Sequence, residues 1–403
     1  MKIFNKENAF ILLAMLCGFF ICAEYAIVRP VSNSLFIHVF GSHCFPYAWL
    51  ATVPLSLLAV SLYNYLLPRW GCNRLFFASI VAVILVNSVI SFAFPFFPKL
   101  SFFFYVWKEV YIMLMFQQLW SVIHATIPLN RAKALYGIFF GVGGLGSIFG
   151  SSIPSFFAVE YGSETLLLMT LPLYALLVLS YRQLVKVSSV AQLPIELEEA
   201  KQTSWRSFSY GCKLIRDSRF LLFALIIVIL MQLSSAFLDF EFNDALGRLY
   251  PDKDLRTQFS ARLLAIGHFA TVTLQFVGSY LFIRLLGVKK SHLAIPLLLG
   301  CNCLLYAFFP LFSLLSFSFM AIKAFDFSIF GVLREMLYVP LKSDEKFRAK
   351  AVIDIFAYRA AKAGAAFLIL AFQPFLTELS ILLCALWIGA IFWGLKDYEK
   401  VTA

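Results

Sequence analysis

Charged residues are scarce in this chain of 403 residues. They make up 14% of the sequence, hydrophobic residues make up 61%, and the mean hydropathy is +0.85. This balance excludes an ordinary soluble domain, in which about 25% of residues are charged. Long apolar runs recur instead, and roughly 20 apolar residues in a helix cross a hydrocarbon core. Because only helices and closed barrels satisfy their own backbone hydrogen bonds in lipid, we predict an all-α, multi-pass protein of the lipid bilayer.

The motifs of catalysis and metal binding are also missing. The eight cysteines show neither metal nor disulfide spacing, so we interpret Cys301 and Cys303 as helix-packing residues. No P-loop is present. A GxGxxG pattern at 141–146 lies inside an apolar run with no strand before it, which favours close helix contact over a dinucleotide site. Without a nucleophile–base pair either, we predict no enzyme, no cofactor and no metal.

Apolar runs between Pro, Gly and charged residues predict twelve transmembrane helices, six on each side of a polar gap. The arrangement predicts an N-terminal six-helix half over 1–181, a cytoplasmic connector over 182–219 and a C-terminal six-helix half over 220–403. The predicted spans are 9–38, 45–67, 75–97, 100–127, 134–158, 165–181, 220–242, 259–283, 292–313, 314–339, 351–375 and 378–395.

Lysine and arginine are distributed unevenly over the predicted loops. Most of the 33 fall on the side of the N-terminus, and the opposite side holds Lys99, Arg248, Lys253 and Arg256. Cytoplasmic loops carry the excess of Lys and Arg, so both termini and the connector are predicted to be cytoplasmic. The formal net charge of +11 is therefore a topology signal and implies no nucleic-acid partner.

A short repeat indicates a duplicated unit. The tetrapeptide RAKA occurs at 131–134 and again at 348–351, each time after a Pro-Leu pair and in the loop between the fourth and fifth predicted spans of a half. The acids Glu24 and Asp239, 215 positions apart, both lie in the first span of their halves. Two halves joined by a cytoplasmic connector are the architecture of major-facilitator-type transporters.

Ionisable residues inside the predicted spans are costly in lipid, which makes each a functional candidate. Cations lie in both halves, where guanidinium and ammonium groups suit phosphate or carboxylate oxygens, so we predict an anionic solute. The structural alternative is pairing across helices, for which Lys108-Glu109 and Arg334-Glu335 are the best candidates. Acids would position these cations or gate the transport path by exchanging partners. The cations are Arg29, Lys108, Arg334, Arg359 and Lys362, and the acids are Asp239, Glu241, Asp326 and Asp354.

The segment from Arg334, "REMLYVPLKSDEKFRAKAVIDIFAYRAAKAG", resembles the nucleotide transporters (ATP/ADP translocases) of plastids and obligate intracellular bacteria, whose pattern is KEMAYIPL…KGKAAIDxxxxRxGKSGG. Residues at matching positions include Glu335, Tyr338, Pro340, Lys350, Asp354, Arg359 and Lys362. "AKALYGIFFGVGG" is similar to the family's AKRFYxLFGxGAN, and "EYAIVRPVSN" is similar to its first-span NYxILRDTKD.

The resemblance implies a twelve-helix carrier that exchanges ATP for ADP or imports other nucleotides, with basic residues holding the phosphates. We assign substrate binding to Arg29, Lys350, Arg359 and Lys362, and gating or charge-partner roles to Glu24, Asp239, Arg334, Glu335 and Asp354. Two departures affect the substrate prediction. Pro30 replaces the family's Asp, and Ser32 replaces its Lys, which removes an expected cation.

The sequence is also consistent with two other functions. One is a major-facilitator-type carrier of another solute, with proton coupling through Glu24 or His268; alone, His268 is better explained as a packed or pore-lining residue. The other is a divergent homologue that does not transport, which the loss of the lysine at Ser32 favours. In each case the predicted location is a bacterial inner membrane.

Overall fold

The computed structural model describes residues 6–127, 129–188, 212–338 and 352–402, and in these ranges the chain is helical with no strand. The prediction of an all-α protein is confirmed. Eight helical segments in the same ranges are long and apolar enough to cross a membrane. They are Lys6–Phe40, Ser42–Ala93, Gly137–Tyr161, Thr165–Val187, Arg219–Leu249, Arg284–Phe308, Phe312–Arg334 and Arg359–Gly394.

The helices form two compact units. The first draws on the described residues within Met1–Cys44, Leu50–Ile195 and Leu246–Val272, and the second on those within Phe45–Trp49, Glu196–Ala245 and Thr273–Ala403.

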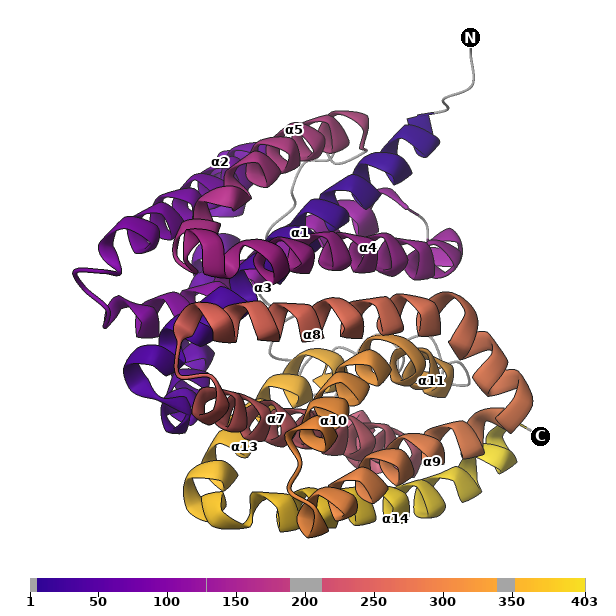
Figure 1. The fold of residues 1–403 in the computed structure, drawn as a ribbon. Helices are drawn as coiled ribbons and strands as arrows, with labels where there is room; N and C mark the ends of the chain where they lie inside the picture. Colours follow the sequence, from indigo (N-terminus) through magenta and orange to yellow (C-terminus); the bar gives the residue numbers. More distant parts are fainter. Residues whose placement is uncertain (1–5, 128, 189–211, 339–351, 403) are drawn as a thin grey trace. The chain divides into compact units, whose positions relative to one another are not determined.

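In the first unit, α1 packs against α3, α4 and α5 (Figure 1). Two apolar clusters pack along α1. In the first, Phe10, Cys17 and Ile21 of α1 lie with Tyr111 and Tyr174. In the second, later residues of α1 lie with residues of α3 and of the segment after α4. The elements are α1 (Lys6–Phe40), η1 (Ser42–Cys44), α2 (Phe45–Ala93), α3 (Leu100–Thr126), α4 (Leu129–Tyr161), η2 (Thr165–Thr170) and α5 (Leu171–Val187).

Glycine interrupts two long helices at related positions. The predicted span 45–67 and most of the predicted span 75–97 lie in α2, which leaves helical geometry between them at Gly71, with φ 71° and ψ 165°. Helix α9 (Ser279–Phe308) does the same at Gly287, with φ 73° and ψ 170°. This region of backbone space is essentially restricted to glycine. The two glycines are 216 positions apart, so the breaks follow the spacing of the sequence repeat.

The glycines of α4 bring it against α1. A Cβ atom added to Gly146 would meet the backbone carbonyl of Phe19, and one added to Gly150 would meet that of Ala23. Because backbone cannot yield as a side chain can, neither position has room for a larger residue. The prediction that the glycines of α4 serve close helix contact is confirmed at Gly146 and Gly150 and is wrong at Gly137, where an added Cβ would have open space around it.

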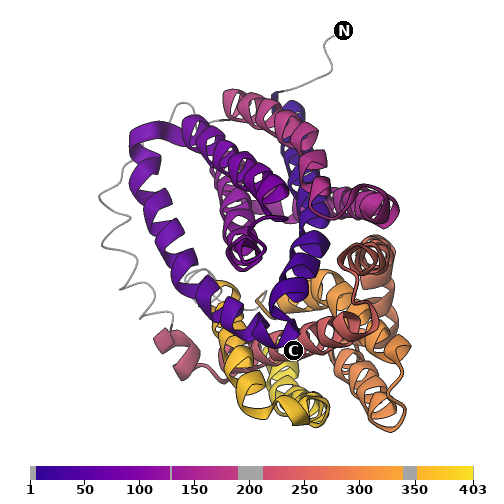
Figure 2. The same ribbon diagram turned by 60° about the vertical axis from the view of Figure 1, so that its left-hand side comes forward.

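Residues 246–272 follow the connector in sequence but pack in the first unit. Helix α8 (Lys253–Thr273) runs beside α4, as both ribbon views show (Figures 1 and 2). Arg262 Nε donates to the Ser155 carbonyl at 3.1 Å, and Gly144 provides space for Val272.

In the second unit, α9 packs against α10, α11 and α14. In the described part of this unit, three π-helical turns interrupt the helices, and such turns occur frequently at functional sites. The elements are α7 (Arg219–Leu249), η4 (π, Leu274–Gly278), α9, α10 (Phe312–Phe325), η5 (π, Asp326–Phe330), α11 (Gly331–Tyr338), η6 (π, Val352–Ala357), α13 (Tyr358–Phe372), η7 (Gln373–Phe375) and α14 (Leu376–Thr402).

Candidate functional site

A buried lysine lies in the first unit. Lys108 of α3 is 1% exposed, and its Nζ donates to Asn33 Oδ1 of α1 at 3.0 Å. The same Nζ lies 3.4 Å from Glu109 Oε1 and 4.1 Å from the centroid of the Tyr105 ring. Lys108 therefore pairs with Glu109 as predicted, but within α3, and the contact that crosses to another helix is the hydrogen bond to Asn33.

A second lysine takes a related position in the second unit. Lys323 of α10 donates to Ser235 Oγ at 3.0 Å and lies 3.5 Å from Asp239 Oδ2, both on α7. Asn243 Nδ2 donates to Asp239 Oδ1 at 3.1 Å and to the Asp239 carbonyl at 2.7 Å. Lys108 and Lys323 are 215 positions apart, the same spacing as Glu24 and Asp239.

Glu24 lies in a different environment from Asp239. Its carboxyl group is fully buried, and the hydroxyl groups of Tyr111 and Tyr174 each donate to Oε1 at 2.6 Å. Asn87 Nδ2 donates to the Tyr174 hydroxyl at 2.8 Å, so four helices contribute to one polar cluster. Among the described residues no cation pairs with Glu24.

Asp326 and Arg334 lie in adjoining elements of the second unit. Asp326 is in the π-turn η5 and accepts from Gln232 Nε2 through both carboxylate oxygens, at 3.4 and 3.2 Å. Half-buried Arg334 in α11 and Lys323 both exert their positive charge on it. Glu241, another acid of α7, accepts from Thr377 at 2.8 Å. Asp326 therefore lies among a donor and two cations, whereas Glu241 has a hydroxyl donor and the acids Asp244 and Glu378 near it.

Arg359 and Lys362 are both half-buried on α13. Since they are three residues apart, they lie on the same side of the helix. The Lys362 ammonium is 5.5 Å from the centroid of the Trp49 ring, close enough for a cation–π contact. The structure thus places two of the predicted phosphate-binding cations together in the second unit.

The remaining predicted residues are only partly described. Arg29 is half-buried in α1, and its charge acts on His268 of α8. Lys350 lies outside the described residues. Glu335 belongs to α11 and Asp354 to η6, but their side chains are outside the described part of the structure. Within the described ranges no three His, Cys, Asp or Glu side chains gather as metal ligands.

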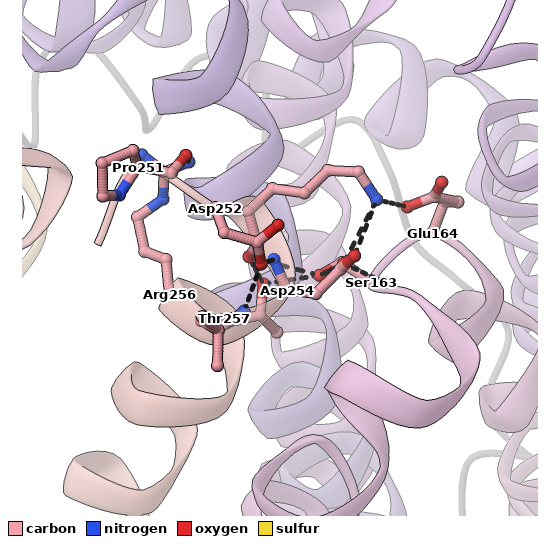
Figure 3. A network of polar contacts seen from close by, with 9 residues as sticks. Ser163, Glu164, Pro251, Asp252, Asp254, Arg256 and Thr257 are labelled. Atoms are coloured by element: carbon pink, nitrogen blue, oxygen red, sulfur yellow. Dashed lines mark hydrogen bonds and ion pairs between the residues drawn. The ribbon is translucent and has the colours of Figure 1, made fainter.

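A polar network connects the end of α4 to the start of α8 (Figure 3). Ser163 Oγ donates to Asp254 Oδ1 at 2.6 Å and lies 2.8 Å from Thr257 Oγ1. Lys253 Nζ forms ion pairs with Glu164 Oε2 at 2.6 Å and with Asp254 Oδ1 at 3.2 Å. We call these five residues, Ser163, Glu164, Lys253, Asp254 and Thr257, the α4–α8 clasp.

The charge states of α8's first turn stabilise the clasp. Asp252 accepts from the backbone N–H groups of Leu255 at 2.8 Å and Asp254 at 2.9 Å, which is the geometry of a helix N-cap. These bonds, the Leu255 bond foremost, hold the pKa of Asp252 below its ordinary value. Burial acts to lower the pKa of Lys253, but Glu164 and Asp254 outweigh it and raise that pKa. Both groups are therefore ionised at neutral pH.

Sequence reasoning missed the partners of Glu24 and the clasp. Tyr111, Tyr174 and Asn87 are ordinary residues of apolar runs, and no local pattern marks them as a cluster. A signal did exist for Lys323, because its distance from Lys108 repeats the Glu24–Asp239 spacing. For the clasp, the concentration of charge at 252–256 predicts a loop, whereas Lys253 begins α8.

The comparison with family models concerns the segment that carries Lys323, Arg359 and Lys362. Residues 318–398 match the TLC ATP/ADP transporter family. Similar curated proteins include carriers of this type. ADP,ATP carrier protein 3 of Rickettsia bellii is 23% identical over 353 residues, which cover 73% of this chain and 69% of the relative. ADP,ATP carrier protein 1 of Rickettsia typhi is 22% identical over 343 residues, covering 74% of this chain and 68% of the relative.

Solved structures give the fold. The nucleoside transporter NupG superposes with a TM-score of 0.64 at 12% identity, covering 97% of this chain and 99% of its own. A D-xylose–proton symporter superposes with a TM-score of 0.65 at 14% identity, covering 96% and 97%. The fold is therefore major-facilitator-like, and the predicted resemblance to nucleotide transporters is confirmed. These relatives are transporters and not enzymes.

Proposed function

We propose that this protein is a secondary active transporter of the nucleotide-translocase type, which exchanges or imports ATP, ADP or a related phosphorylated anion. The observation that carries the proposal is the match of residues 318–398 to the TLC ATP/ADP transporter family. Similarity to rickettsial ADP,ATP carriers over nearly three quarters of the chain supports the same substrate class.

The proposed phosphate contacts are Arg29, Lys350, Arg359 and Lys362. Arg359 and Lys362 lie on one side of α13, where a guanidinium and an ammonium group suit two oxygens of a polyphosphate. Asp239 is proposed as the charge partner that keeps Lys323 in position. Glu24, Arg334, Glu335 and Asp354 are proposed as further gating or charge-partner residues.

The proposed topology has twelve transmembrane helices in two six-helix halves, 1–181 and 220–403, with the connector 182–219 and both termini in the cytoplasm. The asymmetry of Lys and Arg in the loops supports this orientation. The proposed location is the inner membrane of a bacterium.

Alternating access requires contacts that form in one state and break in another. The α4–α8 clasp suits this role because it joins two parts of the chain about 90 residues apart through polar contacts. Polar contacts of this kind are exchanged for water at modest cost. We propose that the clasp closes the non-cytoplasmic side of the transport path and opens once in each cycle.

The test is uptake of labelled nucleotides by bacterial cells that express the full chain. Cells with correctly inserted protein should take up labelled ATP or ADP, and unlabelled nucleotide should compete. Arg359→Ala and Lys362→Ala should each reduce uptake at least about tenfold, the effect of losing roughly 1.4 kcal/mol of a charged contact. Arg69→Ala, which removes an exposed cation stacked on Tyr65 in α2, is the matched control and should transport normally.

Three results would reject parts of the proposal. Absence of uptake for every nucleotide by inserted protein would reject the nucleotide-carrier function. Uptake of a different solute would favour the alternative carrier. Normal uptake by both the Arg359 and Lys362 variants would reject the assigned phosphate contacts.

A further inference from the structure

Glu24 forms the centre of a buried polar cluster that the proposed exchange of nucleotides does not by itself require. Its side chain is fully buried in α1, and hydroxyl groups from α3 and α5 both donate to one oxygen of the carboxyl group. Behind these hydroxyl groups lies the side-chain amide of Asn87 in α2, which donates a hydrogen bond to the Tyr174 hydroxyl. An acid surrounded in this way is neither a surface group nor half of an ion pair.

The two oxygens of this carboxyl group are unequal. Oε1 accepts two hydrogen bonds, whereas Oε2 is buried and has no hydrogen-bond partner among the described residues. An ionised carboxylate in this position would leave a charged oxygen without a donor, which is costly in a dry interior. A proton on Oε2 removes that charge and leaves both tyrosine hydrogen bonds in place.

Among the residues that the structure describes, no neighbouring charge replaces the missing donor. The groups that face Glu24 are Tyr111 from α3, Tyr174 from α5 and, on α1 itself, Cys22, all of which are ordinarily neutral at pH 7. From α2 the nearest polar group is the Asn87 amide, and α4 approaches this turn of α1 with Gly150. In these surroundings, only protonation can remove the negative charge of the Glu24 carboxylate.

The related position in the second unit provides an internal comparison. Asp239, 215 positions after Glu24, pairs with Lys323 at 3.5 Å, while Lys108, the counterpart of Lys323, is bound to Asn33 and Glu109 instead. The same chain thus holds one intramembrane acid beside a cation and one between two tyrosines. The first arrangement favours a fixed charge, and the second favours a carboxyl group that gains and loses a proton.

We propose that Glu24 is a proton-binding site that couples proton movement to nucleotide transport. The coupling rests on the proposed function, whereas proton binding by Glu24 does not. Water on one side of the membrane supplies the proton, which bonds to Oε2 of the carboxylate and gives a neutral acid. The O–H bond breaks and the proton leaves to water on the other side. No electron is transferred, and the two tyrosine hydroxyls retain Oε1 throughout.

Proton binding is tested without transport, by infrared spectroscopy of the purified full chain in liposomes. The band of a protonated carboxyl group should disappear as the pH is raised, and Glu24→Gln should lack it. Glu160→Gln, which changes an exposed acid near the end of α4, should retain it. If Glu24→Gln fails to insert, the Tyr111→Phe and Tyr174→Phe variants are measured instead. Each should shift the pH at which half of the carboxyl band has disappeared. A band absent from the unaltered protein, or a midpoint unmoved in both tyrosine variants, would overturn the proposal.

Coupling is tested in the same liposomes with labelled ATP. A gradient of one pH unit, acid outside, should support about tenfold accumulation for each coupled proton. The informative quantity is ATP accumulation with the pH gradient divided by ATP accumulation without it. In Glu24→Gln this ratio should fall to one. A purely structural defect would lower both accumulations and leave the ratio unchanged. A ratio of one in the unaltered protein with normal ATP exchange would overturn coupling alone. Absence of ATP exchange would reject the proposed function, and the infrared result would still decide whether Glu24 binds a proton.

Discussion

Replacing Gly150 by alanine tests the packing of α4 against α1 directly. The added Cβ would meet the backbone of Ala23, with the carbonyl oxygen, carbonyl carbon and Cα all too close. Relief requires the two helices to separate, because a backbone cannot rotate away as a side chain can. Overpacking of this kind costs about 1–3 kcal/mol.

The control is the same substitution at Gly137, also within α4. A Cβ at Gly137 would have open space around it, and the residue is exposed. Alanine there gains roughly 1 kcal/mol of helix propensity without a steric penalty. The same propensity gain applies at Gly150, so the two variants should differ by about the full 1–3 kcal/mol of overpacking.

The assay is unfolding of the purified protein in detergent by increasing SDS, followed by the loss of helical circular dichroism. Gly150→Ala should unfold at lower SDS than the unaltered protein, and Gly137→Ala at the same or higher SDS. Equal stability of the two variants would refute the close contact between α4 and α1.

Three further predictions follow from the described contacts. With the eight native cysteines replaced, oxidation of a Ser163→Cys/Thr257→Cys pair should block nucleotide uptake and a reductant should restore it, because the native hydroxyl oxygens are 2.8 Å apart; full uptake by cross-linked protein would exclude the clasp as a gate. Asp252→Ala should destabilise the start of α8 by about 1 kcal/mol, measured by proteolysis near residue 252, whereas Asp252→Asn should retain the cap. Because the folded-state pKa of Asp252 is lowered, its stabilisation is present above its ordinary pKa and is lost as the pH falls through the lowered value, so the alanine variant should lack this acid sensitivity. Gly71→Ala should cost about 1–3 kcal/mol in SDS unfolding, since its φ of 71° and ψ of 165° suit glycine alone, and an unchanged midpoint would show that the break in α2 is dispensable.

The helical architecture was predictable because lipid leaves little choice. Long apolar runs with few charges must be helical to satisfy their backbone groups, and the ranges of α1 and α3 follow these runs closely, whereas α7 and α14 extend about seven residues past the predicted spans. Helix boundaries were less predictable. The predicted gap between the spans 45–67 and 75–97 does contain the break, at Gly71, but the helix continues through Pro68 and Arg69 before it leaves helical geometry.

The candidate site was predictable in its residue types and not in its partners. Arg359 and Lys362 followed from a motif, and Asp239 from the rule that acids in a membrane are functional. The choice of partner depends on which helices meet. Glu24 and Asp239 look equivalent in sequence, yet Tyr111 and Tyr174 surround one and Lys323 pairs with the other. The departures Pro30 and Ser32 lie in α1, where Ser32 is fully buried.

The measurement that tests the central claim most directly is nucleotide counterflow in liposomes that contain the purified full chain. Liposomes loaded with unlabelled ATP and diluted into a trace of labelled ADP should accumulate the label transiently above its external concentration. Liposomes loaded with buffer should not do so, and Lys362→Ala should reduce the accumulation at least about tenfold. If loaded and unloaded liposomes take up the label equally, the protein is not a nucleotide exchanger.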